Sequence, residues 1–150
     1  MTRRMGRALW VLPVLLLAAG CDESLEDLTG PTPNLEPTLS SIQREIFDKS
    51  DESGRLACTQ CHIPGGIAAG TGLILTEGNS YANLVNRASS LKPGETRVIP
   101  GDPDRSYFIR KLEGGPDIIG VRMPRGNGPF LTEGQMLVIR TWIQRGALNN

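Results

Sequence analysis

Apolar residues recur at helical spacing in four stretches of this chain, all beyond residue 37. The stretches cover residues 39–49, 79–86, 102–115 and 132–146. No stretch alternates apolar and polar residues convincingly, apart from the weak "GLILT" and "RVI". The pattern therefore predicts a mainly α domain with long connections between short helices.

Local signals mark where two of these helices begin and end. In the third stretch Asp102 is placed to cap the helix, Pro103 suits its first turn, and Gly114 can stop it. Thr132 and Gln135 form a capping box at the start of the fourth stretch. The residues predicted to face inward are Leu39, Ile42, Ile46, Phe47, Tyr81, Leu84, Val85, Phe108, Ile109, Leu112, Met136, Ile139 and Ile143.

Short helices and long loops leave this small domain with little to stabilise it. Helices of this length are marginal by themselves, and aromatic residues are few. Small domains of this kind usually depend on disulfides, a metal or a cofactor. The sequence therefore predicts such a group, and the remaining motifs indicate which one.

The N-terminus has the layout of an export signal. Three arginines precede the apolar run over residues 8–19, which is too short to span a bilayer. The run ends in "LLAAGC", which resembles the bacterial lipobox, so we expect a signal peptide over residues 1–20 and an acylated Cys21. An ordinary cleaved signal with an incidental cysteine is the alternative.

Residues 21–38 are acidic and rich in proline, which is typical of a tether rather than a packed segment. The folded domain is then expected over residues 39–150. Loss of the signal removes Arg3, Arg4 and Arg7, so 13 basic side chains remain against 16 acidic ones, a formal charge of −3. Such a chain has no basic stripe for nucleic acid, and we expect it to bind none.

The stretch "LACTQCHIPGG" contains Cys58, Cys61 and His62, the last being the only histidine of the chain. Structural zinc needs four ligands, and too few are present. A thioredoxin-like site needs a preceding strand, which the pattern does not predict. Cys-x-x-Cys-His is instead the signature of covalent haem attachment, in which both thiols form thioethers and the histidine binds the iron. A disulfide or a chance occurrence of the motif remains open.

With one histidine, the sixth iron ligand must be methionine, another weak donor, water or nothing. Outside the signal only Met123 and Met136 are available. Met136 lies on the inward stripe of the last helix, where methionine usually fills a core. Met123 lies in the irregular "GVRMPRG" and precedes Pro124, which restricts its conformation. We therefore predict Met123, with an iron that no second side chain binds as the alternative.

Four motifs together resemble the cytochrome c-like domains of exported bacterial proteins and lipoproteins. They are "ACTQCH", "PGDPDRSYFIRKLEG", "RMPRG" and "LTEGQMLVIRTWIQRGA", in that order, and the resemblance covers about residues 40–148. It implies the all-α cytochrome c fold, one covalent haem c, and axial iron ligands His62 and Met123. It also implies that the first and last helices cross and pack, which would bring together Leu39, Ile42, Ile46, Phe47, Ile139, Trp142 and Ile143.

Two features depart from that family. The segment between Phe47 and Cys58 is longer than in compact members, which places the usual contacts of the first helix in question. Arg125 follows Pro124 where many such domains have a second proline, so its charge lies either near the haem edge or, as we expect, in solvent.

The sequence thus predicts an electron carrier rather than an enzyme. We expect a monohaem c-type cytochrome that is lipid-anchored to a bacterial membrane, faces the periplasm and meets redox partner proteins there. One alternative is a haem enzyme or ligand sensor with an open sixth site, where Arg122 or Arg125 supplies a polar group. Another is a haem-free structural lipoprotein with a disulfide between Cys58 and Cys61.

Overall fold

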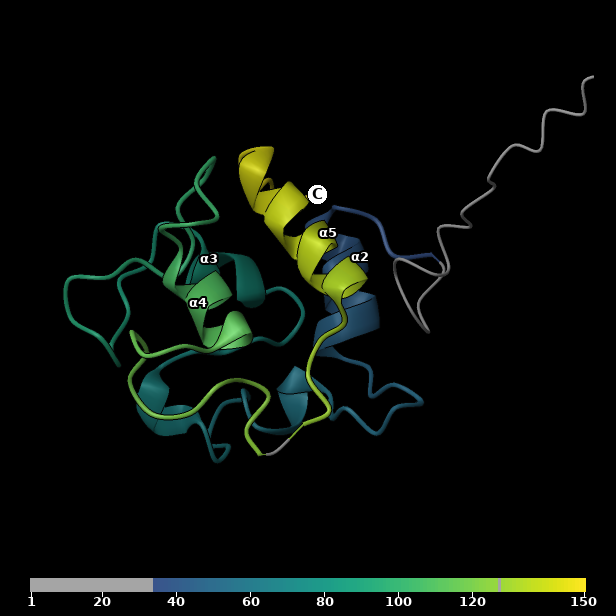
Figure 1. Ribbon diagram of the computed structural model, residues 1–150, viewed down its shortest axis with the longest axis horizontal. Coiled ribbons are helices and arrows are strands. Elements are labelled where there is room, and N and C mark those ends of the chain that lie inside the picture. The colour runs from purple at the N-terminus through teal and green to yellow at the C-terminus, as the bar shows by residue number, and fades with distance from the viewer. Residues whose placement is uncertain (1–33, 127) are drawn as a thin grey trace, which may run out of the picture.

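A computed structural model describes residues 34–126 and 128–150 of the protein. The predicted signal peptide, Cys21 and most of the predicted tether lie outside these residues. The described chain is mainly helical, as predicted, and its elements are short (Figure 1). In chain order they are α2 (Leu39–Ile42), the π-helical turn η1 (Gln43–Phe47), the 3-10 turns η2 (Cys58–Gln60) and η3 (Ala69–Thr71), α3 (Ser80–Leu84), α4 (Tyr107–Glu113) and α5 (Glu133–Gln144).

The first and last helices pack against each other and form the centre of the core (Figure 1). Thr38 caps α2 by accepting a hydrogen bond from the Ser41 N–H, and α5 has the predicted capping box of Thr132 and Gln135. The residues predicted to meet across these helices belong to one buried cluster. That cluster includes Leu39, Ile42, Ile46, Phe47, Ile139, Trp142 and Ile143.

The core begins earlier in the chain than the pattern predicts. Leu35 is only 3% exposed and belongs to the core cluster, so the boundary predicted at residue 39 is too late. The Glu36 N–H donates to the Ser41 hydroxyl, which fixes this segment against α2. A single leucine among prolines and acidic residues has no periodicity, and for that reason the sequence gives no sign of its burial.

The start of α4 also differs from the prediction. The helix begins at Tyr107 with Ser106 as its N-cap, so Asp102 and Pro103 do not open it. The Asp102 carboxylate instead accepts hydrogen bonds from the N–H and the side chain of Arg105. Aspartate followed by proline favours a turn as readily as a helix start, and here the turn is formed. Gly114 ends α4 as predicted, at a φ of +84° that favours glycine.

No strand is present in residues 34–126 and 128–150, but three isolated β-bridges occur. Two of them pair Val85 with Val98 and Ala88 with Thr96, which holds the segment leading into α4 beside the end of α3. The bridges therefore position the segment around Arg97.

Within residues 34–126 and 128–150, no helix is long and apolar enough to cross a membrane.

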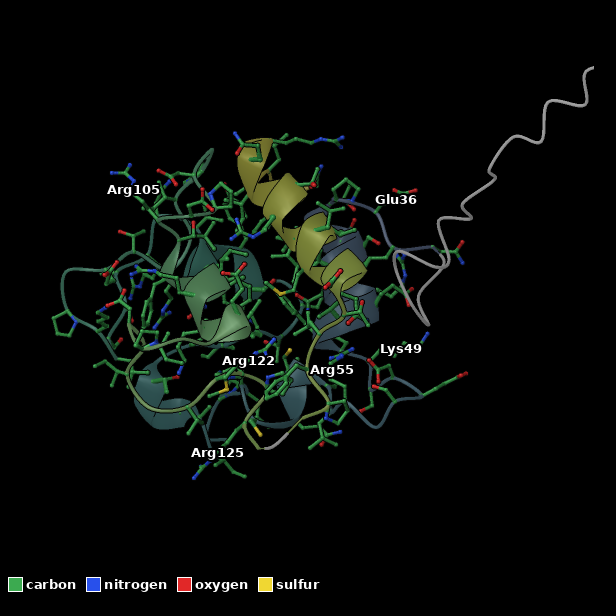
Figure 2. All side chains as sticks on the ribbon, in the orientation of Figure 1. Glu36, Lys49, Arg55, Arg105, Arg122 and Arg125 are labelled. Carbon is green, nitrogen blue, oxygen red and sulfur yellow. The ribbon has the colours of Figure 1, made fainter. Side chains whose placement is uncertain are left out.

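The longer connection before Cys58 is an ordered unit built around a buried arginine. The Arg55 side chain is fully buried and donates to Asp51 at 2.9 Å and to the carbonyls of Ile46 and Lys49. Burial alone would raise the pKa of Asp51, but hydrogen bonds from Ser53 and Arg55 outweigh it and lower that pKa. Figure 2 shows Arg55 inside the fold, whereas Lys49 extends outward. This buried pair therefore fixes the connection between η1 and Cys58 against the end of η1.

Candidate functional site

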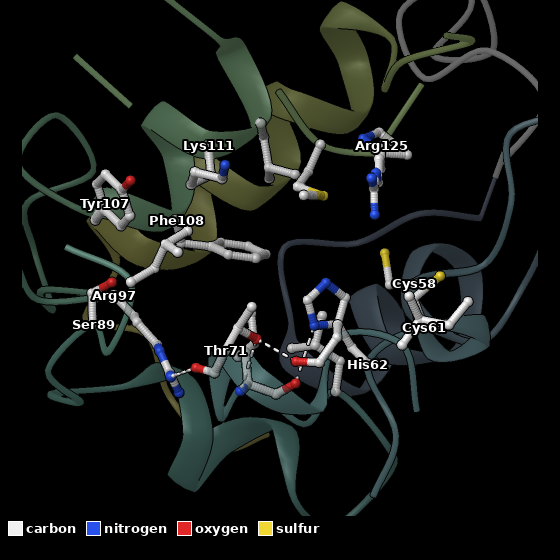
Figure 3. A pocket seen from close by; sticks show the side chains of 18 of the residues that line it. Cys58, Cys61, His62, Thr71, Ser89, Arg97, Tyr107, Phe108, Lys111 and Arg125 are labelled. Atoms are coloured by element: carbon white, nitrogen blue, oxygen red, sulfur yellow. Dashed lines mark hydrogen bonds between the residues drawn. The ribbon is translucent and has the colours of Figure 1, made fainter. Parts of the chain in front are cut away.

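A mostly apolar cavity of about 260 Å³ opens between η2, the loop after it, α4 and the loop that follows α4 (Figure 3). It is lined by both cysteines of the Cys-x-x-Cys-His motif, by His62 and by Met123. Cys58 and Met123 thus border the same cavity, although they are 65 positions apart in the sequence. Its apolar walls include Leu56, Ala57, Ile67, Ala68, Leu73, Leu75, Leu91, Phe108, Leu112 and Pro124.

Cys58 and Cys61 lie on or just after the single turn η2 and are free thiols. The N–H groups of Cys61 and His62 both donate to the Cys58 carbonyl, at 3.2 and 2.9 Å, which closes the turn. Burial raises the pKa of Cys58 to about 11, so this thiol is protonated at neutral pH. Figure 3 shows both cysteines on the same side of His62. The disulfide that the haem-free alternative predicts between them is not formed in the structure.

His62 extends into the cavity with one ring nitrogen fixed (Figure 3). Its Nδ1 lies 3.1 Å from the carbonyl oxygen of Leu73. A carbonyl can only accept, so Nδ1 carries the hydrogen and Nε2 has the lone pair. Burial lowers the pKa of His62, the Leu73 hydrogen bond opposes this, and the charges of Arg97 and Lys111 lower the pKa further. The side chain is therefore a neutral imidazole suited to bind a metal through Nε2.

The structure distinguishes the two candidate methionines by position. Met123 is partly buried, lines the cavity, and its N–H donates to the Lys111 carbonyl at 2.8 Å. Met136 is 9% exposed, belongs to the core cluster and does not line the cavity. Met123 is thus the one methionine of the described chain that the fold brings to the same space as His62.

The cavity wall is positively charged, and the sequence pointed to only one of its charged residues, Arg125. Arg97, Lys111 and Arg125 line the cavity, and no aspartate or glutamate of the described chain does. Arg97 is buried and gives four hydrogen bonds to neutral acceptors, namely the carbonyls of Thr71, Gly72 and Asn83 and the Ser90 hydroxyl. Burial lowers the pKa values of both Arg97 and Lys111. The site therefore suits a mostly apolar ligand that also carries negatively charged groups.

One signal in the sequence could have identified Lys111. It lies three residues after Phe108 and next to Leu112, both on the inward face of α4, where a charged residue is unexpected. Arg97 has a weaker signal, because it stands beside the buried Val98 in a segment without a clear element. Its partners come from loops far away in the chain, so no local pattern reveals its burial.

The two arginines of the open-site alternative occupy different places. Arg125 is exposed and also borders the cavity, on the side of Cys58 (Figure 3). Its charge is therefore in solvent, as expected, and near the site as well. Arg122 does not line the cavity. Its guanidinium lies 3.9 Å from the Phe130 ring centroid, and its Nε donates to the Leu112 carbonyl.

Other metal chemistry has little support in the geometry. Among residues 34–126 and 128–150, no three histidine, cysteine, aspartate or glutamate side chains are grouped so that they could hold a metal ion. One imidazole and two thiols that border an apolar cavity suit a metal within a large apolar group better than a bare ion. Comparison of the chain with family models, with curated proteins and with solved structures gives no significant match. The resemblance to cytochrome c-like domains thus stays a prediction from the sequence.

Proposed function

We propose that this protein is a monohaem c-type cytochrome that carries electrons at a bacterial membrane. Haem c would be attached through Cys58 and Cys61, its iron would be bound by His62 and Met123, and Cys21 would carry the lipid anchor. The observation that supports this most is that these two cysteines, the histidine and the methionine border the same apolar cavity. The predicted cytochrome c fold is part of this proposal, and the observed mainly α class is compatible with it.

Cys58 is a protonated thiol, and both cysteines border the cavity in which attachment would take place. Each cysteine would add its S–H across a vinyl group, with the sulfur bonding to one carbon and the hydrogen going to the other. This addition balances without an oxidant or a reductant. Cys58 is a protonated thiol in an apolar setting, and both cysteines belong to one closed turn. The chain therefore presents two free thiols from one turn.

The two proposed axial ligands differ in how they are oriented. The Leu73 carbonyl holds the His62 ring and leaves Nε2 free to donate to iron. Met123 supplies a soft thioether from the loop opposite. Bound haem supplies one-electron chemistry between ferric and ferrous iron, and a histidine and methionine pair favours the reduced state. The residues of this chain would bind and orient the haem, and they would exclude water from it.

The cationic wall suits the carboxylates of haem. An isolated buried guanidinium is costly, and an anionic group beside it lowers that cost. Figure 3 shows Arg97 on the side of His62 away from the two cysteines. The two cysteines and Arg97 would hold the group from different sides of one cavity. Arg97 is then the residue that would bind a carboxylate.

An electron carrier must expose part of its cofactor to partners. Leu56, Ile67 and Leu91 border the cavity and are exposed, with Ile67 reaching 81%. An apolar rim of this kind suits the small, transient contacts of redox partners. The carrier role is favoured over an open-site enzyme because a methionine borders the cavity, whereas the second histidine that would act as a distal base is absent from the sequence.

Mass spectrometry and visible spectra of the exported protein test this proposal. We expect the mature chain to carry one haem and lipid on Cys21, with a reduced spectrum typical of low-spin haem c. Exported protein with an intact Cys58 and Cys61 pair and no haem would refute the proposal. The Met123→Ala variant should turn high-spin in the ferric state; a spectrum unchanged by this substitution would refute the ligand assignment alone.

A further inference from the structure

We propose that Lys111 is a positioning residue that holds the methionine loop, residues 114–126, against α4 and thereby keeps Met123 at the cavity. This inference rests on the proposed binding of iron by His62 and Met123. The Lys111 ammonium group donates to the carbonyls of Ile119 and Val121. The Lys111 carbonyl accepts from the Met123 N–H at 2.8 Å. One residue thus contacts the loop at three points, one of them Met123 itself.

Other residues of α4 bind the same loop. The Tyr107 hydroxyl accepts from the Ile119 N–H at 2.9 Å, and the Leu112 carbonyl accepts from Arg122 at 2.7 Å. Arg110 pairs with Asp117 at 2.6 Å. The helix therefore presents a row of polar contacts to the loop, with Lys111 at its centre.

Outside α4, Lys92 donates to the carbonyl and the carboxylate of Asp117 in the loop, and Met123 packs against the core. The loop's apolar side chains Ile119 and Val121 are 49% and 51% exposed, so their burial contributes little. The loop has no helix or strand of its own, and Gly114, Gly115 and Gly120 have positive φ. Segments with few buried contacts open at low free energy. The contacts from α4 are more numerous than those from Lys92, and they include the hydrogen bond to Met123 itself.

Among the residues of α4, Lys111 makes the strongest hydrogen bonds to the loop. It is only 9% exposed, and no carboxylate of the described chain pairs with it. Hydrogen bonds from a charged group are about twice as strong as neutral ones, and removing such a group leaves its acceptors unpaired. A thioether is a weak iron ligand, so its persistence depends on a loop already held in place. Loss of Lys111 should therefore weaken the bond between Met123 and the iron.

Competition with free imidazole on the ferric, haem-loaded protein measures this effect. Imidazole can bind the iron only after the Met123 sulfur leaves, so its affinity reports how firmly the loop holds. Lys111→Met keeps the side-chain length without the charge and should raise imidazole affinity about tenfold, the scale of one charge-assisted hydrogen bond. Lys111→Arg should stay within about threefold of the wild type. Lys49→Met, the same change at an exposed lysine paired with Glu45, should have no effect.

A double-variant cycle separates positioning from general destabilisation. In the Met123→Ala background, Lys111→Met should add nothing, because no thioether remains to be held. An equal effect in both backgrounds, or none in either, would overturn the role of Lys111. If Met123→Ala alone leaves imidazole affinity unchanged, Met123 is not the ligand, and both proposals fail. If that variant raises the affinity and Lys111→Met does not, only the present inference fails.

A milder variant covers the case in which Lys111→Met fails to load haem. Tyr107→Phe keeps the aromatic ring and removes only the acceptor for the Ile119 N–H. Imidazole affinity should then rise about two- to fourfold, again only when Met123 is present. An affinity equal to that of the wild type would show that α4 does not position the loop.

Discussion

The two sides of the cavity are held in place by different kinds of contact. On the histidine side, residues 58–75 are joined mainly by backbone bonds, such as Leu75 N–H to the His62 carbonyl and Ala68 N–H to the Cys61 carbonyl. On the methionine side, the loop depends largely on the side chains of α4. Backbone bonds survive most substitutions, whereas side-chain bonds do not. The histidine side should therefore be robust and the methionine side adjustable.

The largest expected effect comes from removing the chemistry of the histidine side. Exported Cys58→Ser/Cys61→Ser protein should retain no covalent haem, because no other described cysteine borders the cavity. Met123→Ala should retain covalent haem and lose only the low-spin ferric spectrum. Haem staining after denaturing electrophoresis, with visible spectra, measures both. Covalent haem on the double variant would contradict the assignment of the two cysteines.

The second effect concerns the connection that leads into Cys58. Arg55→Met would leave Asp51 buried without its charged partner and would remove the hydrogen bonds of Arg55 to three carbonyls. Breaking a buried pair in this way costs about 3–5 kcal/mol of unfolding free energy. Chemical denaturation measures this cost, with Arg44→Met as the control, since Arg44 pairs with Glu45 at the surface and should change stability by less than about 0.5 kcal/mol. Equal effects of the two variants would show that the buried pair does not stabilise the connection.

The same pair predicts how stability depends on pH. The pKa of Asp51 is lower in the folded protein than its ordinary value of 3.8. A lowered carboxyl pKa stabilises the fold fully above the ordinary value, and this contribution is lost as pH falls through the folded value. Unfolding free energy should therefore decline below about pH 4. Asp51→Asn should flatten this decline, and an unchanged slope would mean that other carboxyl groups cause it.

Both sides of the cavity could be predicted only where their residues follow local patterns. The capping box of α5 was predicted and is present, and the cysteine and histidine motif, which lies within five consecutive residues, borders the cavity. The predicted start of α4 is wrong because aspartate and proline also favour a turn. Arg97 and Lys111 were missed since their burial depends on carbonyls from other segments. Local patterns therefore indicate which groups are candidates for chemistry but not which groups surround them.

The next prediction concerns Arg97 and tests whether the cavity wall recognises carboxylates. Full-length Cys58→Ser/Cys61→Ser protein can be titrated with haem or with its dimethyl ester, while the Soret absorbance is followed. We expect a preference of about tenfold for the diacid, as one charge-assisted bond provides, and Arg97→Gln should remove it. Binding of the ester shows that each variant is folded. Arg105→Gln, a change at an exposed arginine, should keep the preference. A preference that survives Arg97→Gln would contradict this role.

The smallest expected effect concerns the exposed ion pairs that Asp117 forms on the methionine side. Hydrogen bonds from Lys92 and Arg110 hold the pKa of Asp117 below its ordinary value, so these pairs persist at neutral pH. Exposed pairs contribute little and are screened by salt. Asp117→Asn should therefore raise imidazole affinity less than about threefold, and the difference should vanish near 1 M salt. The effect of Lys111→Met should remain, because the Lys111 side chain is nearly buried and its ammonium group donates to carbonyls rather than to an exposed carboxylate. Equal salt sensitivity in both variants would mean that the methionine loop is held by surface charge rather than by Lys111.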